Sequence, residues 1–268
     1  HILNSSCVNS ASESSSSAGI YIEKSSKVIK IKHSYFLHNS APGLCVKEGS
    51  TVTIIQSFFC QNSGKTGGAA YIIDVKKVIT YNSTYILNKA RDYGGALRLD
   101  GKGSIDADIR YTLSVKNCTF INNTGKIGGG IYIEKYQTIE IDKTRFLHNF
   151  AKSSGPGMHV KKARVLTAAQ SIFHQNSGNK GGGAYVVDVL KVTTYSSTYS
   201  LNVASDKGGA LRITNENNLK NVSFFIFNCV FLKNKSPDGA AVHILEYNNI
   251  HILNSSCVNS ASESSSSA

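Results

Sequence analysis

Short segments along the whole chain alternate apolar and polar residues. The segments 96–99 (ALRL) and 130–133 (GIYI) carry an apolar side chain at every second position, and each follows or begins in a run of glycines. A second such segment follows in each repeat, as at Leu113 and Val115. A period of two is that of a β-strand. The pattern predicts an all-β chain of short strands joined by glycine-containing turns.

A second signal is an aromatic residue followed three positions later by Asn. The pair recurs eight times, at spacings of 23 to 35 residues. The aromatic residues are Phe36, Phe59, Tyr85, Phe120, Phe146, Phe173, Tyr199 and Phe231, and the Asn residues are Asn39, Asn62, Asn88, Asn123, Asn149, Asn176, Asn202 and Asn234. Fixed anchors at variable spacing are typical of a solenoid, whose turns accept insertions while its strands stay stacked.

Parallel stacking would give both columns a structural role. Equivalent residues of successive coils lie about 4.8 Å apart along the axis of such a solenoid. We therefore expect the aromatic rings to form an interior stack and the Asn side chains to pass amide hydrogen bonds from coil to coil. An unpaired buried amide costs about 1 to 3 kcal/mol. The two columns are expected to be structural ladders.

The position two residues before each aromatic holds only Ser, Thr or Cys. Cys118 and Cys229 fill it in two coils and are expected to be packed, reduced residues. Four coils separate them, which is too far for a disulfide. The cysteine spacing supports neither a disulfide framework nor a CxxC metal site.

Two kinds of internal repetition organise the chain. Four coils are duplicated with a shift of 110 to 114 residues, and the segments 81–99 and 195–213 share 13 of 19 residues. Residues 1–18 return without a change as residues 251–268. We interpret residues 1–268 as a single continuous solenoid: one 250-residue tandem unit of about nine coils plus the start of the next. The alternative is that one end was copied as a cap.

The coil shared by the two ends lacks both signature residues. Cys7 and Cys257 occupy the aromatic position, and Ser10 and Ser260 occupy the Asn position. A Ser-rich, low-complexity stretch follows at residues 12–17. We predict that this coil, the seam between units, is the softest part of the solenoid.

The net charge changes the interpretation little. It is +12, from 29 Lys and Arg against 17 Asp and Glu, and Lys residues are scattered over turns and outward strand positions. A nucleic-acid partner calls for a concentrated basic patch or interleaved aromatics, so a solvated surface is favoured. No apolar run of 18 residues predicts a transmembrane segment. No signal peptide is visible at His1, which says little because the segment looks cut from something longer.

Candidate catalytic acids come in duplicated pairs. Asp74 and Asp188 lie in IIDVKK and VVDVLK, while Asp92 and Asp206 lie beside a glycine turn. Polysaccharide lyases and hydrolases on a β-helix need a concentrated set of Asp with Arg or Lys on one face. A catalytic site is normally built once, from diverged residues. We therefore interpret these as surface acids and expect no enzyme, no cofactor and no metal site, since the histidines match no ligand spacing either.

Asn-X-Ser/Thr sequons begin at Asn4, Asn82, Asn117, Asn122, Asn221, Asn234 and Asn254. Several lie near the aromatic and Asn columns. Asn82 and Asn221 are the candidate glycosylation sites.

The paired signatures Gly-Gly-Ala-Leu at 94–97 and Phe-Ile-Asn-Asn at 120–123 resemble the repeats of the chlamydial polymorphic membrane protein family. Similar repeats occur in surface proteins of some protists. The resemblance covers essentially the whole chain, and it implies a right-handed parallel β-helix that is secreted or displayed as an adhesin-like passenger. The 250-residue super-repeat departs from that family.

The expected function is structural: a stiff extracellular or cell-surface filament built from tandem units. The expected partner is the chain itself, through end-to-end continuation and possible lateral bundling, with glycans or a host or cell surface as further candidates and no nucleic acid. An adhesin displaying the Ser-rich stretch and the long turn at 100–108 is the alternative. A polysaccharide lyase or hydrolase is the third.

Overall fold

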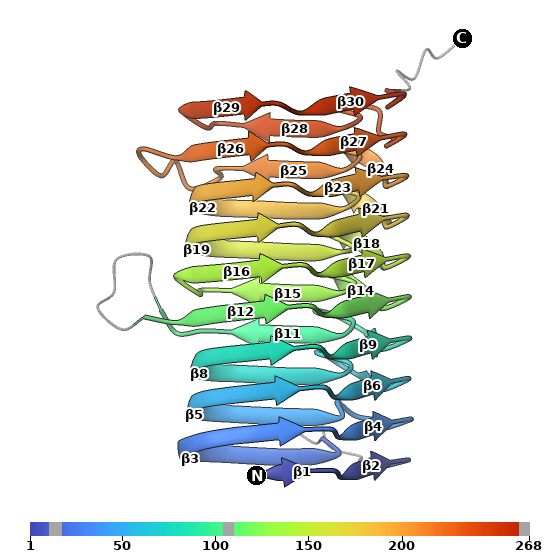
Figure 1. The fold of residues 1–268 in the computed structure, drawn as a ribbon, viewed down its shortest axis with the longest axis vertical. Coiled ribbons are helices and arrows are strands. Elements are labelled where there is room, and N and C mark those ends of the chain that lie inside the picture. Colours follow the sequence, from blue (N-terminus) through green and yellow to red (C-terminus); the bar gives the residue numbers. More distant parts are fainter. Residues whose placement is uncertain (11–17, 104–109, 263–268) are drawn as a thin grey trace.

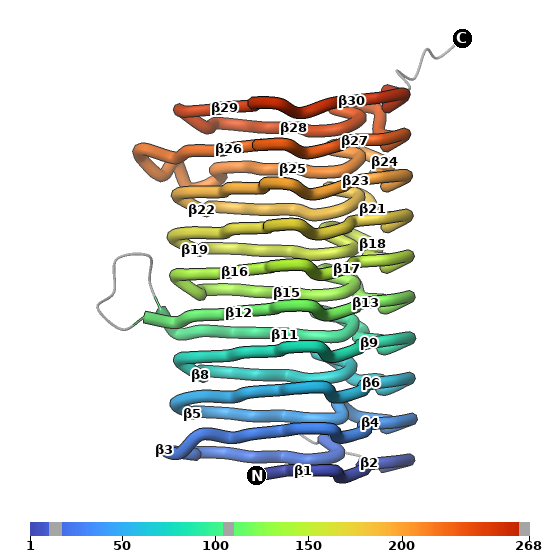
Figure 2. The backbone as a smooth tube through the Cα atoms, in the orientation of Figure 1, coloured from blue at the N-terminus to red at the C-terminus, as the bar shows by residue number. Residues whose placement is uncertain are grey.

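A computed structural model describes residues 1–10, 18–103 and 110–262. Within these ranges every strand pairing is parallel and no helix occurs. The chain winds upward in stacked coils, with β1 at one end of the long axis and β29 and β30 at the other (Figure 1). The tube in Figure 2 shows each coil lying directly on the one before. The expected all-β parallel solenoid is confirmed.

The largest sheet, sheet A, has fourteen strands. They are β1 (Ile2–Leu3), β3 (Ile20–Lys32), β5 (Leu44–Ile55), β8 (Ala70–Tyr81), β11 (Leu97–Asp100), β12 (Thr112–Lys116), β15 (Ile131–Glu134), β16 (Thr138–Asp142), β19 (Met158–Ala169), β22 (Ala184–Tyr195), β25 (Leu211–Thr214), β26 (Ser223–Phe227), β28 (Val242–Leu245) and β29 (Asn249–Leu253). The long strands bend at a residue with positive φ, such as Glu48, Asp74 or Asp188. Each therefore covers two sides of the coil.

Sheet B has ten short strands in uninterrupted order. They are β2 (Ser6–Val8), β4 (Tyr35–Leu37), β6 (Phe58–Cys60), β9 (Thr84–Ile86), β13 (Thr119–Ile121), β17 (Arg145–Leu147), β20 (Ile172–His174), β23 (Thr198–Ser200), β27 (Val230–Leu232) and β30 (Ser256–Val258). The middle residue of each strand is the column aromatic, or Cys7 and Cys257 at the two ends. Sheet B thus carries the aromatic column through eight consecutive strands, with a Cys in the same position of the strand at each end.

Sheet C lies between the Asn and the glycines, where the sequence pattern predicts only turns. It contains β7 (Ser63–Gly64), β10 (Lys89–Ala90), β14 (Thr124–Ile127), β18 (Phe150–Ser154), β21 (Ser177–Lys180) and β24 (Val203–Lys207). These segments are short and rich in Gly, Ala, Ser and Lys, and their pairing shifts register at several coils. Period-two alternation is therefore absent although the backbone pairs.

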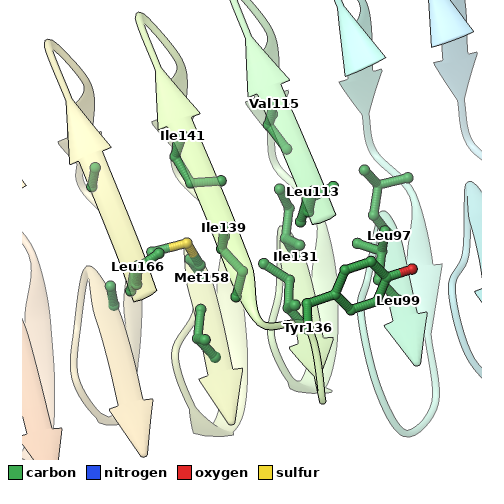
Figure 3. Packing of buried hydrophobic residues seen from close by; sticks show 14 of the residues in the cluster. Leu97, Leu99, Leu113, Val115, Ile131, Tyr136, Ile139, Ile141, Met158 and Leu166 are labelled. Atoms are coloured by element: carbon green, nitrogen blue, oxygen red, sulfur yellow. The ribbon is translucent and has the colours of Figure 1, made fainter. Parts of the chain in front are cut away.

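The core lies between the sides of each coil. Figure 3 shows Leu97 and Leu99 of β11, Leu113 and Val115 of β12, and the corresponding residues of the next coils on the inner side of their strands. Leu99, Val115 and Ile141 are fully buried. No helix long and apolar enough to span a membrane was found in the described residues.

Candidate functional site

The aromatic column is an unbroken stack of eight rings. Neighbouring centroids are 4.5 to 5.1 Å apart and neighbouring ring planes differ by 1 to 14°. The hydroxyls of Tyr85 and Tyr199 are satisfied by Thr80 at 2.8 Å and Thr194 at 3.0 Å. Burial is the main cause that raises the pKa of both phenols above its ordinary value. Rings at this separation contribute stacking energy beyond the apolar area that they bury.

The Asn column forms a continuous chain of side-chain amides. Asn123 is typical: its Nδ2 donates to Asn149 Oδ1 at 3.0 Å and to the carbonyl oxygen of Tyr85 at 2.9 Å. Its Oδ1 accepts from both the Nδ2 and the backbone N–H of Asn88, each at 3.0 Å. Both side-chain donors and the acceptor are thus paired in a fully buried position. The amide satisfies the backbone at the corner between sheets B and C, which no apolar residue can do.

The two ladders end at the shared coil. Cys7 lies beside Phe36 and Cys257 beside Phe231 in the register of sheet B. The backbone N–H of Ser10 donates to Asn39 Oδ1 at 2.9 Å. At the other end, Ser260 Oγ accepts from the backbone N–H of Asn234 at 3.2 Å. A Cys and a Ser thus continue the columns with fewer contacts, because Cys has no ring to stack and Ser has no second side-chain donor.

Asp74 and Asp188 anchor the two long insertions. Asp74 accepts hydrogen bonds from the Tyr111 hydroxyl and from Lys102 Nζ, the latter at 2.6 Å. Asp188 accepts from the backbone N–H of Asn217 at 2.9 Å and from Asn217 Nδ2. Burial acts to raise the pKa of Asp74, but the hydrogen bonds from Lys102 and Tyr111 outweigh it and hold this pKa below its ordinary value. The two carboxylates are engaged by their own loops and lie four coils apart.

Tyrosines of the coil above complete both anchors. Tyr136 and Tyr247 each reach back two coils, and their hydroxyls donate to the carbonyl oxygens of Val75 at 3.1 Å and Val189 at 2.7 Å. The sequence contained this signal in the duplicated pairs Asp74/Asp188 and Tyr136/Tyr247, which accompany duplicated insertions. A duplicated acid beside a duplicated insertion indicates an anchor.

The other candidate acids and the histidines do not come together in a common site in the described residues. Asp92 lies 4.0 Å from Arg91, and Asp206 lies 3.6 Å from Arg212. His38 and His148 are exposed on the outside of the solenoid, 110 residues apart. No group of three potential metal ligands lies together in the described residues.

A recess on sheet A was not predicted from the sequence. Arg98 packs against the rings of Tyr71, Tyr93 and Tyr132 and forms a 2.7 Å ion pair with Asp100. Nearby, a cavity of about 410 Å³ is lined by residues that include His159.

Within this recess, His159 stacks on Tyr132 with centroids 5.3 Å apart, and its Nδ1 lies 3.1 Å from Ser154 Oγ. Burial, with a smaller effect of Lys161, lowers the pKa of His159 to about 3. The imidazole is therefore neutral near pH 7 and packs as a flat ring in the column of outward aromatics.

The two candidate glycosylation sites are both exposed. Asn82 has a positive φ of 49° at the corner before sheet B, and Asn221 has a φ of 58° in the second long insertion. Asn234, by contrast, is a fully buried member of the Asn ladder. Its sequon is inaccessible in the folded chain.

Comparison with known proteins identifies the fold family. The family model described as "Right handed beta helix region" matches residues 4–149. No curated protein and no solved structure matches the chain. The matched segment spans more than half of the chain and contains the ladder positions from Asn39 to Asn149. The chain therefore belongs to the right-handed β-helix family.

Proposed function

We propose that the chain is one unit, with the start of the next, of a stiff structural shaft at the cell surface or outside the cell. The observation that supports the proposal is the strand pairing of the identical segments, as far as the structure describes them in both copies (residues 1–10 and 251–260). Their first copy pairs with the coil that follows it: Ile2 lies opposite Ile31 and Cys7 opposite Phe36. Their second copy pairs with the coil that precedes it: Ile252 lies opposite Ile226. The same sequence thus pairs with a following coil in its first copy and with a preceding coil in its second copy.

If one copy of this segment makes both pairings at once, consecutive units form one continuous solenoid with no unpaired edge between them. A unit of about nine coils at about 4.8 Å per coil advances the axis by about 43 Å. The exposed edge strands that a short solenoid must cover are then paired with the next unit. Ile252 is 54 % exposed in the final coil although it belongs to an interior column. A following unit would bury it.

The described residues support a structural role over a catalytic one. The acids that suggested an enzyme, Asp74 and Asp188, hold their own loops. The right-handed β-helix family includes both enzymes and other proteins, so membership alone does not decide. The resemblance to polymorphic membrane protein repeats supports placement at a surface. It also supports the alternative, an adhesin-like passenger. Of its candidate contact segments, the Ser-rich stretch at 12–17 and residues 104–108 of the long turn at 100–108 lie outside the described residues.

A two-unit chain, residues 1–250 followed by 1–268, tests the shaft by small-angle X-ray scattering. We expect a rod that is about 43 Å longer than the one-unit chain and has the same cross-section. Two matched variants probe the seam. Ile252→Asp, on the inner side of β29, should turn the long rod into two rods joined by a flexible link, because a buried carboxylate breaks the coil. Leu253→Asp, the next residue and on the outer side, should leave the rod straight.

A two-unit chain whose cross-section widens while its length stays constant would contradict the shaft. Equal effects of the two substitutions would contradict the proposed burial of Ile252.

A further inference from the structure

The outer face of sheet B differs from the rest of the surface. In each three-residue strand the middle side chain points inward, so the first and third residues form this face, which we call the short-strand face. The third position is aliphatic in seven of the ten strands, for example Leu37, Ile86, Ile121 and Leu147. These four side chains are half-buried.

Exposed apolar residues also occupy the first position of several strands. Tyr35 is 53 % exposed, Val230 39 % and Ile172 36 %. Single exposed apolar residues are ordinary, whereas a contiguous apolar strip marks an interaction surface. The short strands run the full height of the solenoid, from β2 to β30 (Figure 1). Nine of the ten carry at least one apolar residue on this face, and β23, with Thr198 and Ser200, interrupts the strip.

The short-strand face carries almost no charge. All twenty of its strand positions lie in the described residues, and Arg145 is the only Lys, Arg, Asp or Glu among them. Outward positions of sheet A, by contrast, include Lys30, Lys77, Lys116 and Lys191. With a net charge of +12 per chain, two shafts repel wherever these Lys-bearing sides meet within about 8 Å, the screening length at physiological salt. The uncharged face is where that repulsion is weakest.

The geometry of this face repeats along the axis. Its strands are paired without a register shift from β2 to β30. Rows of side chains therefore recur about every 4.8 Å, so the rows of one shaft fit between the rows of another. The aliphatic column also crosses the seam, because Val8 lies beside Leu37 and Val258 beside Leu232.

We propose that the short-strand face binds the same face of a second copy of this chain, side by side. The inference rests on the proposed shaft, which supplies a long enough strip. Ten strands of three residues present a strip of about 48 by 10 Å, or about 480 Å². A stable interface needs about 800 Å² per partner. One unit falls short of that area, whereas a two-unit chain presents about 900 Å².

Sedimentation velocity of one-unit and two-unit chains tests the proposal. The two-unit chain should be a dimer at concentrations where the one-unit chain is a monomer. The face variant replaces the paired residues Ile86 and Ile121 with Lys in each unit. It should raise the dissociation constant of the dimer at least about tenfold, because the introduced ammonium groups must lose water in the interface.

A matched control places the same change on sheet A. Ile55 and Ile79 are also half-buried, outward isoleucines in neighbouring strands. The control variant Ile55→Lys with Ile79→Lys adds equal charge and should leave the dimer intact. Scattering from each variant reports the length of the single rod, so failure of the shaft is seen separately from failure of the pairing.

A two-unit rod that stays monomeric at every concentration would overturn the proposal. Equal weakening by the face and control variants would also overturn it, because the effect would then come from charge alone.

Discussion

Replacing Asn123 with Leu should reveal how much one rung of the Asn ladder contributes to stability. Leu has a similar size but cannot hydrogen-bond. Three buried groups lose a partner: the backbone N–H of Asn88, one N–H of its Nδ2, and the carbonyl oxygen of Tyr85. Asn149 Oδ1 keeps the backbone N–H of residue 123 at 3.0 Å and stays paired.

Each buried group left without a partner costs about 1 to 3 kcal/mol. Three such groups predict a loss of about 3 to 9 kcal/mol in the free energy of unfolding. This loss is larger than that caused by most single substitutions. The predicted loss is large because one amide of the ladder pairs with both the Asn side chain and the backbone of the preceding coil.

Urea denaturation of the one-unit chain, followed by far-UV circular dichroism, measures the change. Asn179→Leu is the control, since Asn179 Nδ2 donates to Ser205 Oγ at 3.0 Å in a solvent-accessible position. This control should change the free energy of unfolding by less than about 1 kcal/mol. If Asn123→Leu costs no more than the control, the ladder is not a source of stability and the reasoning is refuted.

Three further predictions concern the seam, the recess and the loop anchors. In a two-unit chain, backbone amides of residues 251–260 should exchange with solvent at least about tenfold faster than those of residues 118–123, and equal rates would contradict a soft seam. Burial and Lys161 lower the pKa of His159 to about 3 in the folded chain. In the unfolded chain this pKa is about 6.5, so at a pH between about 3 and 6.5 the unfolded chain binds a proton that the folded chain does not. Stability should therefore fall with decreasing pH between about 6.5 and 3, and His159→Phe should remove a slope of up to about 1.4 kcal/mol per pH unit in urea titrations; an unchanged slope would sink this account. Asp188→Ala should cost about 1 to 3 kcal/mol and expose residues 215–222 to proteolysis, whereas resistance equal to that of the unaltered chain would show that Asp188 is not an anchor.

The repeat pattern was sufficient to predict the architecture, because the same residues recur at equivalent positions of each coil. A single Phe120 and Asn123 would mean little, but the same pair in eight coils at variable spacing fits only stacked strands with tolerant turns. The structure confirms the parallel solenoid. It also corrects the assignment of turns between the Asn and the glycines, since β14 and β18 pair there without any apolar alternation.

Side-chain contacts between different columns could not be predicted from the sequence. Nothing in the pattern places Tyr111 on Asp74 or Arg98 against three tyrosines, because these contacts depend on how a loop folds back and how neighbouring coils are rotated. Positive φ values at corner residues such as Leu87 and Leu201 were equally invisible, since the residue type there does not favour that conformation. Tertiary stacking imposes it.

The direction of the backbone hydrogen bonds has a mechanical consequence. Successive strands follow one another along the long axis (Figure 1), so tension applied to the two ends loads these bonds one coil after another. The chain then peels, and each freed coil of 26 residues, such as the one from Phe59 to Tyr85, adds about 90 Å of extensible backbone. We expect yielding to begin at the coil of Cys257 and Ser260, which lacks both the ring and the amide of the other coils. The proposed shaft would then lengthen under tension, with its release points spaced one unit apart.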